Sequence, residues 1–163
     1  MAKKLTNEEI ENLKQAHKVL AKPLRQKWVT QFKSRQLTLE LCSTNQSDRF
    51  KLYMRQSTLN ENDFSCGISY LASNENDITL ARYNGSSHVH VNKSDGQKFI
   101  FECHIHYANE ESLKVSKKIE NFAIKTQRYT NLSGAIQCVL KDFNIIDINI
   151  GQLIEQGGLF DEL

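Results

Sequence analysis

The chain has 163 residues, of which 39% are hydrophobic and 25% charged, and its formal net charge at pH 7 is +2. This length predicts one compact domain, residues 1–163, with an apolar core. The small net charge argues against a strongly basic nucleic-acid-binding protein. A signal-peptide core and a run of about 18 apolar residues are both missing from the sequence, so we expect a cytoplasmic protein that makes no contact with a membrane.

The first predicted element is a helix over residues 7–22. Thr6 and Glu9 have the spacing of a capping box, and apolar residues recur every three or four positions until Pro23 stops or bends the helix. A basic stretch without an acid overlaps its end and comprises Lys22, Arg25, Lys27, Lys33 and Arg35. We expect a solvated charged face there, with contact to phosphate or to an acidic protein surface as the alternative.

The sheet region is predicted at about residues 36–107, where apolar and polar residues alternate. Residues 37–41 and 49–55 form the first two runs, and the polar connector between them is typical of a hairpin. Further runs lie at residues 66–71 and 78–83, and a histidine-containing hairpin completes about six strands. The pattern predicts an antiparallel β-meander or a partly open barrel.

The C-terminal helical region is predicted at about residues 131–160. Its main helix is capped near Asn131 or Ser133, and its apolar side should pack on the sheet. That side comprises Leu132, Ala135, Ile136, Val139, Leu140 and Phe143. A short helix around residues 150–156 would end at Gly157 and Gly158. The predicted fold class is therefore α+β.

The four cysteines are widely separated and form no C-x-x-C pair, which argues against a zinc ribbon. Cys103 falls in an apolar stripe and Cys138 lies between apolar helix positions. We therefore expect buried, reduced thiols.

Four of the five histidines lie in two short repeats, His88-Val89-His90 and His104-Ile105-His106. A turn signal, residues 93–96, separates the repeats. Side chains alternate across a strand, so each pair projects to one face, and a hairpin would bring the pairs together. The fifth histidine, His17, is expected at the surface.

The register of this hairpin follows from its apolar positions. A three-residue loop, residues 94–96, would pair Lys93 with Gln97, so that His88 opposes Glu102 and His90 opposes Ile100. The residues expected in the core are Val89, Val91, Phe99, Phe101, Cys103 and Ile105. The residues expected together on the other face are His88, His90, Glu102, His104 and His106. A two-residue loop would instead separate the histidine pairs.

Three interpretations of the histidines remain open at this point. Imidazoles suit zinc, copper, iron or nickel, and Glu102 would add an oxygen ligand. A metal-free acid–base pair is equally permitted, with Arg82 beside an anionic intermediate. The third interpretation is an exposed sheet face that merely tolerates polar residues.

An ordered series of segments resembles an uncharacterised bacterial family, a domain of unknown function often met in mobile-element or prophage contexts. The segments are residues 47–52, 80–85, 90–92 with Asp95-Gly96, 104–107, 140–145 and 158–160. Their most specific part is the order H-x-N…DG…H-x-H, and the resemblance spans roughly residues 28–160. The chain has Lys93 where the family usually has proline, and residues 108–111 replace a longer tryptophan-containing segment. The resemblance implies that His90, Asn92, His104 and His106 matter more than His88.

These residues favour a small histidine-dependent hydrolase, nuclease-like or toxin-like, that acts on RNA. His90, His104 and His106 would serve as acid, base or ligands of a divalent metal, Arg82 would hold phosphate, and Asn92 would orient a partner. The alternative is a non-enzymatic mobile-element protein that binds or inhibits a host protein. The sequence specifies neither the substrate nor the oligomeric state.

Overall fold

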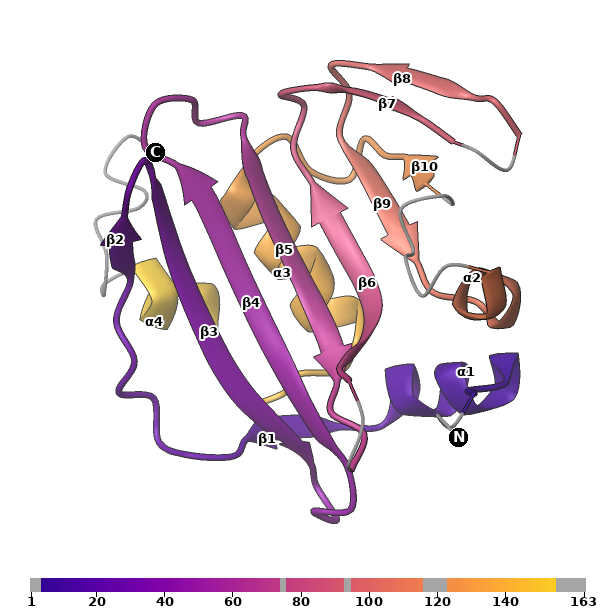
Figure 1. The fold of residues 1–163 in the computed structure, drawn as a ribbon. Coiled ribbons are helices and arrows are strands. Elements are labelled where there is room, and N and C mark those ends of the chain that lie inside the picture. Colours follow the sequence, from indigo (N-terminus) through magenta and orange to yellow (C-terminus); the bar gives the residue numbers. More distant parts are fainter. Residues whose placement is uncertain (1–3, 74–75, 93–94, 116–122, 155–163) are drawn as a thin grey trace.

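The computed structural model describes residues 4–73, 76–92, 95–115 and 123–154. Within these residues an open antiparallel sheet has the strand order β1-β3-β4-β5-β6-β9-β10, and β2 pairs with the N-terminal end of β3 (Figure 1). Two further strands, β7 and β8, form a separate two-stranded ribbon. Helices lie at both ends of this sheet region in the chain, and the predicted α+β class with an antiparallel sheet is confirmed.

The strands of the open sheet are β1 (Lys18–Leu20), β2 (Val29–Gln31), β3 (Ser34–Ser43), β4 (Arg49–Ser57), β5 (Phe64–Tyr70), β6 (Ile78–Asn84), β9 (His104–Tyr107) and β10 (Ala123–Lys125). The ribbon consists of β7 (Val89–Val91) and β8 (Lys98–Ile100), and the helices are α1 (Asn7–Gln15), α2 (Glu110–Val115), α3 (Leu132–Asp142) and α4 (Ile150–Ile154).

Helix α1 begins at the predicted capping box. The Glu9 backbone N–H donates to Thr6 Oγ1 at 3.1 Å, and the Thr6 N–H donates to the Glu9 carboxylate at 2.9 Å. The helix ends at Gln15 rather than at residue 22, because residues 18–20 pair with β3 and become β1. Lys18, the first residue of β1, is fully buried, and its ammonium group donates to the carbonyl oxygens of Ala16 and Phe143 at 2.7 and 2.8 Å. Sheet pairing thus overrides the helical periodicity that continues past Gln15.

One face of the sheet, which we call the core face, packs against α3 (Figure 1). Its strands contribute alternate apolar residues, among them Leu52, Met54, Cys66, Ile68, Tyr83 and Ile105. The predicted cap of α3 is confirmed, since Asn131 Oδ1 accepts from the Gly134 N–H at 2.8 Å. The predicted packing is also confirmed, because Ile136, Val139 and Phe143 are at most 1% exposed. The Tyr83 hydroxyl donates to Asp142 at 2.6 Å and so ties α3 to β6.

The predicted hairpin register is wrong by one residue. His90 pairs with Phe99 rather than with Ile100, and the Asn92 N–H donates to the Gln97 carbonyl oxygen at 2.9 Å. Residue 94 of the predicted loop and residue 93, predicted to pair with Gln97, lie outside the described residues. A shift of one residue reverses the faces of a strand, so the apolar residues Val89 and Val91 point outward and are about half exposed.

The second predicted strand of that hairpin is also interrupted. Phe101 has a φ of 49°, in the left-handed region, so β8 ends at Ile100 and the chain re-enters the open sheet as β9 between β6 and β10. Phe101 is 63% exposed, contrary to the prediction. Phe99, Cys103 and Ile105 are buried as predicted.

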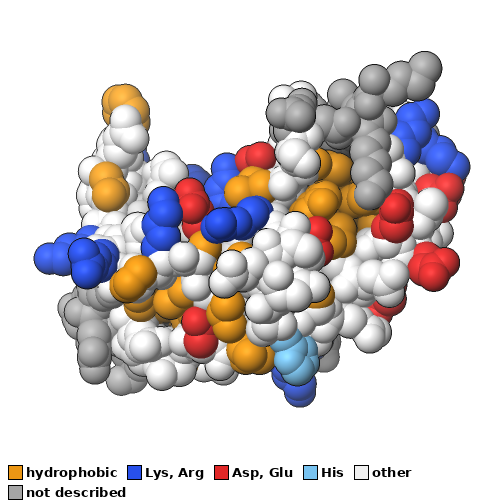
Figure 2. Space-filling model, turned by 90° about the horizontal axis from the view of Figure 1, so that it is seen from below, with side chains coloured by type: hydrophobic (Ala, Val, Ile, Leu, Met, Phe, Trp, Pro, Cys, Tyr) orange, Lys and Arg blue, Asp and Glu red, His pale blue; other side chains and the backbone are white. Residues whose placement is uncertain are grey.

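The remaining predictions concern surface charge, thiols and the tail. Most of the predicted basic stretch is exposed, and basic and acidic side chains are interspersed on the face seen from below (Figure 2). Cys42, Cys66 and Cys103 are free and buried, and Cys138 is free and half-buried. Helix α4 begins at the predicted residue, whereas Gly157 and Gly158 lie outside the described part of the chain. Among the described helices, none is long and apolar enough to cross a membrane.

Candidate functional site

The face of the sheet opposite α3 carries two rows of mostly polar residues, which we call the site face. Cross-strand pairing on β4, β5, β6 and β9 aligns the first row as Tyr53, Gly67, Arg82 and His106. The neighbouring row consists of Arg55, Ser65, Asn84 and His104. Directly paired Cβ atoms lie about 4.5–5.5 Å apart, so the members of each row are direct neighbours, and the Tyr53 ring occupies the space above Gly67, which has no side chain. Arg82 is therefore a direct neighbour of His106, and Asn84 of His104.

The ribbon covers one end of the site face and brings His90 onto His104 and His106. The ring centroids lie 5.0 Å apart for His90 and His104, 4.9 Å for His90 and His106, and 5.1 Å for His104 and His106. One ring nitrogen from each lies within 4.8 Å of the other two, and we call these three residues the histidine cluster. The two repeats thus converge as the sequence predicted, although through a ribbon folded over the sheet and not through one hairpin.

Burial distinguishes the members of the cluster from the other histidines. His104 and His106 are 0% and 1% exposed, so these two do not form the exposed polar face considered above. His90 is partly buried, and its ring stacks on Phe99 at 5.9 Å. His88 is exposed and lies 5.3 Å from the His104 ring, outside the cluster. His17 is exposed, as predicted.

Asn92 holds His90 in place and attaches it to β10. The Asn92 side chain donates from Nδ2 to the Ala123 carbonyl oxygen and accepts at Oδ1 from the Ala123 N–H, both at 2.9 Å. The same Oδ1 lies 3.0 Å from His90 Nε2. Asn92 is 2% exposed, so these are interior hydrogen bonds. The structure therefore gives Asn92 an orienting position beside His90.

His104 is fixed by the backbone at one nitrogen and by an amide at the other. His104 Nδ1 lies 2.9 Å from the Glu102 carbonyl oxygen, and His104 Nε2 lies 3.3 Å from Asn84 Nδ2. Burial and, to a smaller extent, the neighbouring imidazoles His90 and His88 lower the pKa of His104 to about 4, against the opposing effect of the hydrogen bond to the Glu102 carbonyl. At neutral pH this imidazole is uncharged and offers a lone pair.

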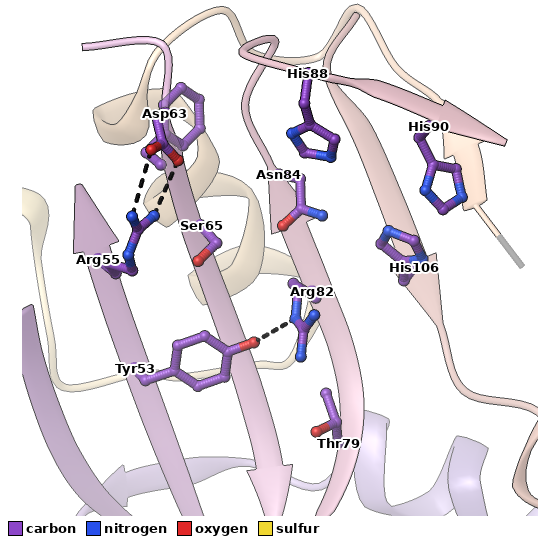
Figure 3. Close-up of a pocket in the computed structure, with 11 residues that line it drawn as sticks. Tyr53, Arg55, Asp63, Ser65, Thr79, Arg82, Asn84, His88, His90 and His106 are labelled. Carbon is purple, nitrogen blue, oxygen red and sulfur yellow. Dashed lines mark hydrogen bonds and ion pairs between the residues drawn. The ribbon is translucent and has the colours of Figure 1, made fainter. Parts of the chain in front are cut away.

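Next to the cluster the site face forms a pocket of about 510 Å³ (Figure 3). The pocket is lined by Tyr53, Arg55, Asp63, Phe64, Ser65, Thr79, Arg82, Asn84, His88, His90 and His106. Arg82 Nε donates to the Tyr53 hydroxyl oxygen at 3.0 Å. This contact requires glycine at position 67, because a Cβ there would collide with the Tyr53 ring. The pocket thus combines imidazoles with guanidinium groups, a set suited to an anionic ligand.

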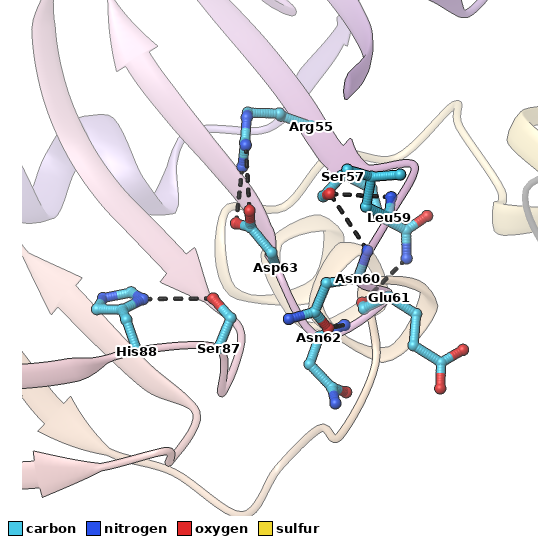
Figure 4. Close-up of polar contacts among 10 residues, drawn as sticks. Arg55, Ser57, Leu59, Asn60, Glu61, Asn62, Asp63, Ser87 and His88 are labelled. Atoms are coloured by element: carbon cyan, nitrogen blue, oxygen red, sulfur yellow. Dashed lines mark hydrogen bonds and ion pairs between the residues drawn. The ribbon is translucent and has the colours of Figure 1, made fainter. Parts of the chain in front are cut away.

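The pocket rim opposite the histidines is formed by Arg55 and the loop after β4. Arg55 forms a bidentate ion pair with Asp63, with N–O distances of 3.0 and 3.4 Å (Figures 3 and 4). Ser57 Oγ accepts from the backbone N–H groups of Leu59 and Asn60, at 3.1 and 3.3 Å (Figure 4). Ser87 and His88 face this loop from the ribbon side. Local hydrogen bonds therefore order the loop side of the opening.

Two differences from the sequence expectation concern the composition of the site. The Glu102 carboxylate pairs with Lys125 at 3.1 Å and is not in the cluster, so it does not provide the oxygen ligand considered above. Tyr53, Gly67 and Asn84 belong to the site face but were not predicted. They could have been predicted from the cross-strand register. Once β4, β5 and β6 are paired, all three fall in the rows that contain Arg82 and the histidines.

A family model described as a family of unknown function, DUF6978, matches residues 5–146. The chain belongs to DUF6978. The matched range contains every residue of the site face, the histidine cluster and α3, so the resemblance to an uncharacterised family is confirmed at this level. No curated protein and no solved structure matches the chain. Membership in this family of unknown function specifies no reaction.

Proposed function

We propose that this protein is a small histidine-dependent hydrolase that cleaves phosphodiester bonds in RNA. The observation that carries the proposal is the direct pairing of Arg82 with His106 across β6 and β9, with both side chains lining one pocket. A guanidinium group binds phosphate, and an imidazole next to it can serve the reacting centre. The volume of about 510 Å³ lies within the usual range of small-molecule sites, which fits a nucleotide unit.

Hydrolysis joins a water oxygen to phosphorus, breaks the bond from phosphorus to the ester oxygen, and transfers a proton from the water to the leaving alcohol. A histidine cluster supports this reaction either by proton transfer at imidazole or through a water held by a metal ion. In both cases Arg82 stabilises the charge that develops on the phosphate oxygens. Asn92 acts as a positioning residue, since it touches His90 and not the pocket.

The resemblance to a bacterial, mobile-element-associated family supports a toxin-like enzyme, and a cytoplasmic location belongs to the same proposal because RNA is the substrate. Expression of the parent protein should then arrest growth of a bacterial host. Expression of His106→Gln should not. A survey of the genes that neighbour family members would test the mobile-element context.

The direct test is incubation of tag-free protein with end-labelled RNA and with DNA of the same sequence. We expect cleavage of RNA by the parent protein and loss of cleavage in Arg82→Gln and His106→Gln, all purified in parallel. His17→Gln serves as the matched control because His17 is exposed and remote from the pocket lining. Equal cleavage by the parent and by His106→Gln would reveal a contaminating nuclease and overturn the proposal.

A second candidate function is the non-enzymatic protein that binds or inhibits a host protein. The observation that favours it is the outer side of the ribbon, where Val89, Val91 and Ile100 are 44–54% exposed and adjacent Phe101 is 63% exposed. Such apolar patches are typical of interaction sites. The double variant Val89→Glu, Ile100→Glu places two charges on this patch. It should abolish the growth arrest if the protein acts by binding a host protein, and it should preserve the arrest if the protein acts as a hydrolase.

A further inference from the structure

We infer that the histidine cluster binds one zinc ion through His90 Nδ1, His104 Nε2 and one ring nitrogen of His106, with a fourth position that opens to the pocket. The inference names the cofactor of the proposed hydrolase and rests on that function for its catalytic meaning. Zinc binding itself is measured separately from RNA cleavage. Only a ring nitrogen that carries no hydrogen has a lone pair with which to bind the ion.

The position of the proton on His90 follows from the hydrogen bonds of the Asn92 side chain. The Ala123 N–H can only donate, so the Asn92 side-chain atom that receives it is the amide oxygen. Because this oxygen can only accept, His90 Nε2 at 3.0 Å must donate to it. A neutral imidazole has one N–H and one lone pair. The lone pair of His90 is therefore on Nδ1.

The proton on His104 follows in the same way from the backbone. The Glu102 carbonyl oxygen can only accept, so His104 Nδ1 at 2.9 Å carries the hydrogen and Nε2 carries the lone pair. The Asn84 amide contacts Nε2 at 3.3 Å, at the long end of hydrogen-bond distances, and a bound ion would replace this contact.

These two outer hydrogen bonds are the type that metal-binding histidines make. A ligating imidazole usually donates its other N–H to a carbonyl or carboxylate, which fixes the ring and raises its basicity as a ligand. His90 does so to the Asn92 amide oxygen, and His104 does so to a backbone carbonyl oxygen. The lone pairs of two rings that lie 5.0 Å apart are thus already specified before any ion binds.

The distances allow one ion to reach all three rings. One ring nitrogen from each histidine lies within 4.8 Å of the other two, whereas tetrahedral zinc with Zn–N bonds of about 2.0–2.1 Å places its ligands about 3.4 Å apart. The His90 and His104 rings are stacked at an interplanar angle of 20°, so one of them has to turn for both in-plane lone pairs to meet the ion. Phe99 stacks on both His90 and His104 at 5.9 Å and provides an apolar wall on one side.

The donor set favours zinc at a catalytic type of site. All three ligands are imidazoles, which suit zinc, and no cysteine or carboxylate joins the cluster among the described residues. Three protein ligands with an open fourth position are characteristic of catalytic zinc, whereas structural sites have four. His90 and His106 both line the pocket, so the fourth ligand would be a water or an oxygen of the substrate.

The experiment is zinc analysis of tag-free protein after dialysis, together with titration of the EDTA-treated protein with zinc and with cobalt. We expect one zinc ion per chain, and a cobalt absorption spectrum of a tetrahedral nitrogen site. His106→Gln and His90→Gln should lose both signals. His88→Gln and His17→Gln, which replace histidines outside the cluster, should retain them. Circular dichroism of each variant shows whether it has folded.

Variants of Asn92 test whether its hydrogen bond to His90 supports zinc binding. Asn92→Ala should weaken zinc binding by about 10- to 100-fold, the usual effect of losing a partner of a ligating histidine. Asn92→Asp keeps an oxygen that accepts from His90 and should restore much of the affinity.

Absence of zinc from the folded parent protein, or equal zinc content in His106→Gln, would overturn the metal site. RNA cleavage that persists in EDTA without metal would overturn the catalytic role of the zinc ion, while preserving the proposed hydrolase. Stoichiometric zinc without cleavage of any RNA would leave the metal site intact and refute the proposed hydrolase.

Discussion

The two faces of the sheet are built by the same strands but are covered in different ways. On β4, Leu52 and Met54 face the core and are at most 1% exposed, whereas Tyr53 and Arg55, which alternate with them, face the pocket. An amphipathic helix covers the core face, and a narrow ribbon that carries His90 covers part of the site face. Strand alternation therefore separates the residues that stabilise the fold from those that form the site, and substitutions on the two faces should have different consequences.

The largest loss of stability should come from the core face. Phe143→Ala removes a ring that is 1% exposed and packed in the core, and it should lower the free energy of unfolding by about 3–5 kcal/mol. Urea denaturation would measure the loss. Ile146→Ala, at a position that is 57% exposed, is the control and should change stability by less than about 0.5 kcal/mol. Similar values for the two variants would show that α3 and its end contribute little to the core.

On the site face, His104→Gln should cost about 1–3 kcal/mol in metal-free protein, because the partly buried Glu102 carbonyl and the buried Asn84 amide lose their partner. His88→Gln is the matched variant, with an effect below about 0.5 kcal/mol, since His88 is exposed. Thermal melts in EDTA would compare them. If both variants have the melting temperature of the parent protein, the ribbon does not bury His104 in solution, and the expected difference between His104 and His88 is refuted.

The pH dependence of stability should identify the same residue. Burial lowers the pKa of His104 from 6.5 to about 4, so between these pH values the unfolded chain holds a proton here that the folded protein does not. The free energy of unfolding of the metal-free protein should therefore fall as the pH falls through this window, and His104 should add no pH dependence above it. Urea midpoints across the window should change less steeply in His104→Gln. Parallel curves for the two proteins would contradict a buried neutral imidazole.

Apart from the control variants, the smallest effect on stability, with a clear effect on the pocket, is expected for Gly67→Ala. The new Cβ would collide with the far end of the Tyr53 ring, which can swing toward the pocket, so the cost should be about 1 kcal/mol. The displaced Tyr53 would leave Arg82, and RNA binding should weaken as it does in Tyr53→Phe. Fluorescence anisotropy with labelled RNA measures both variants. Unchanged binding in both would separate the Tyr53 contact from substrate recognition.

Much of the core face could be predicted from the sequence, because alternation in β4 and the spacing of Ile136, Val139 and Phe143 are local signals. The convergence of the histidines was also predictable from their repeats. The register of the ribbon was not, since the observed pairing of His90 with Phe99 corresponds to neither of the two loop lengths considered from the sequence, and the left-handed Phe101 carries no local signal. The burial of His104 depends on a second layer, the ribbon, which alternation within one strand cannot reveal.

The Asn92 side chain also affects how the sheet ends. Strand β10 is the last strand in the sheet order, and an edge strand presents backbone groups with which another chain can pair and aggregate. Asn92 occupies both the N–H and the carbonyl oxygen of Ala123, as a neighbouring strand would. One amide thereby shields part of this edge, and its loss would leave a short open template for intermolecular β-pairing.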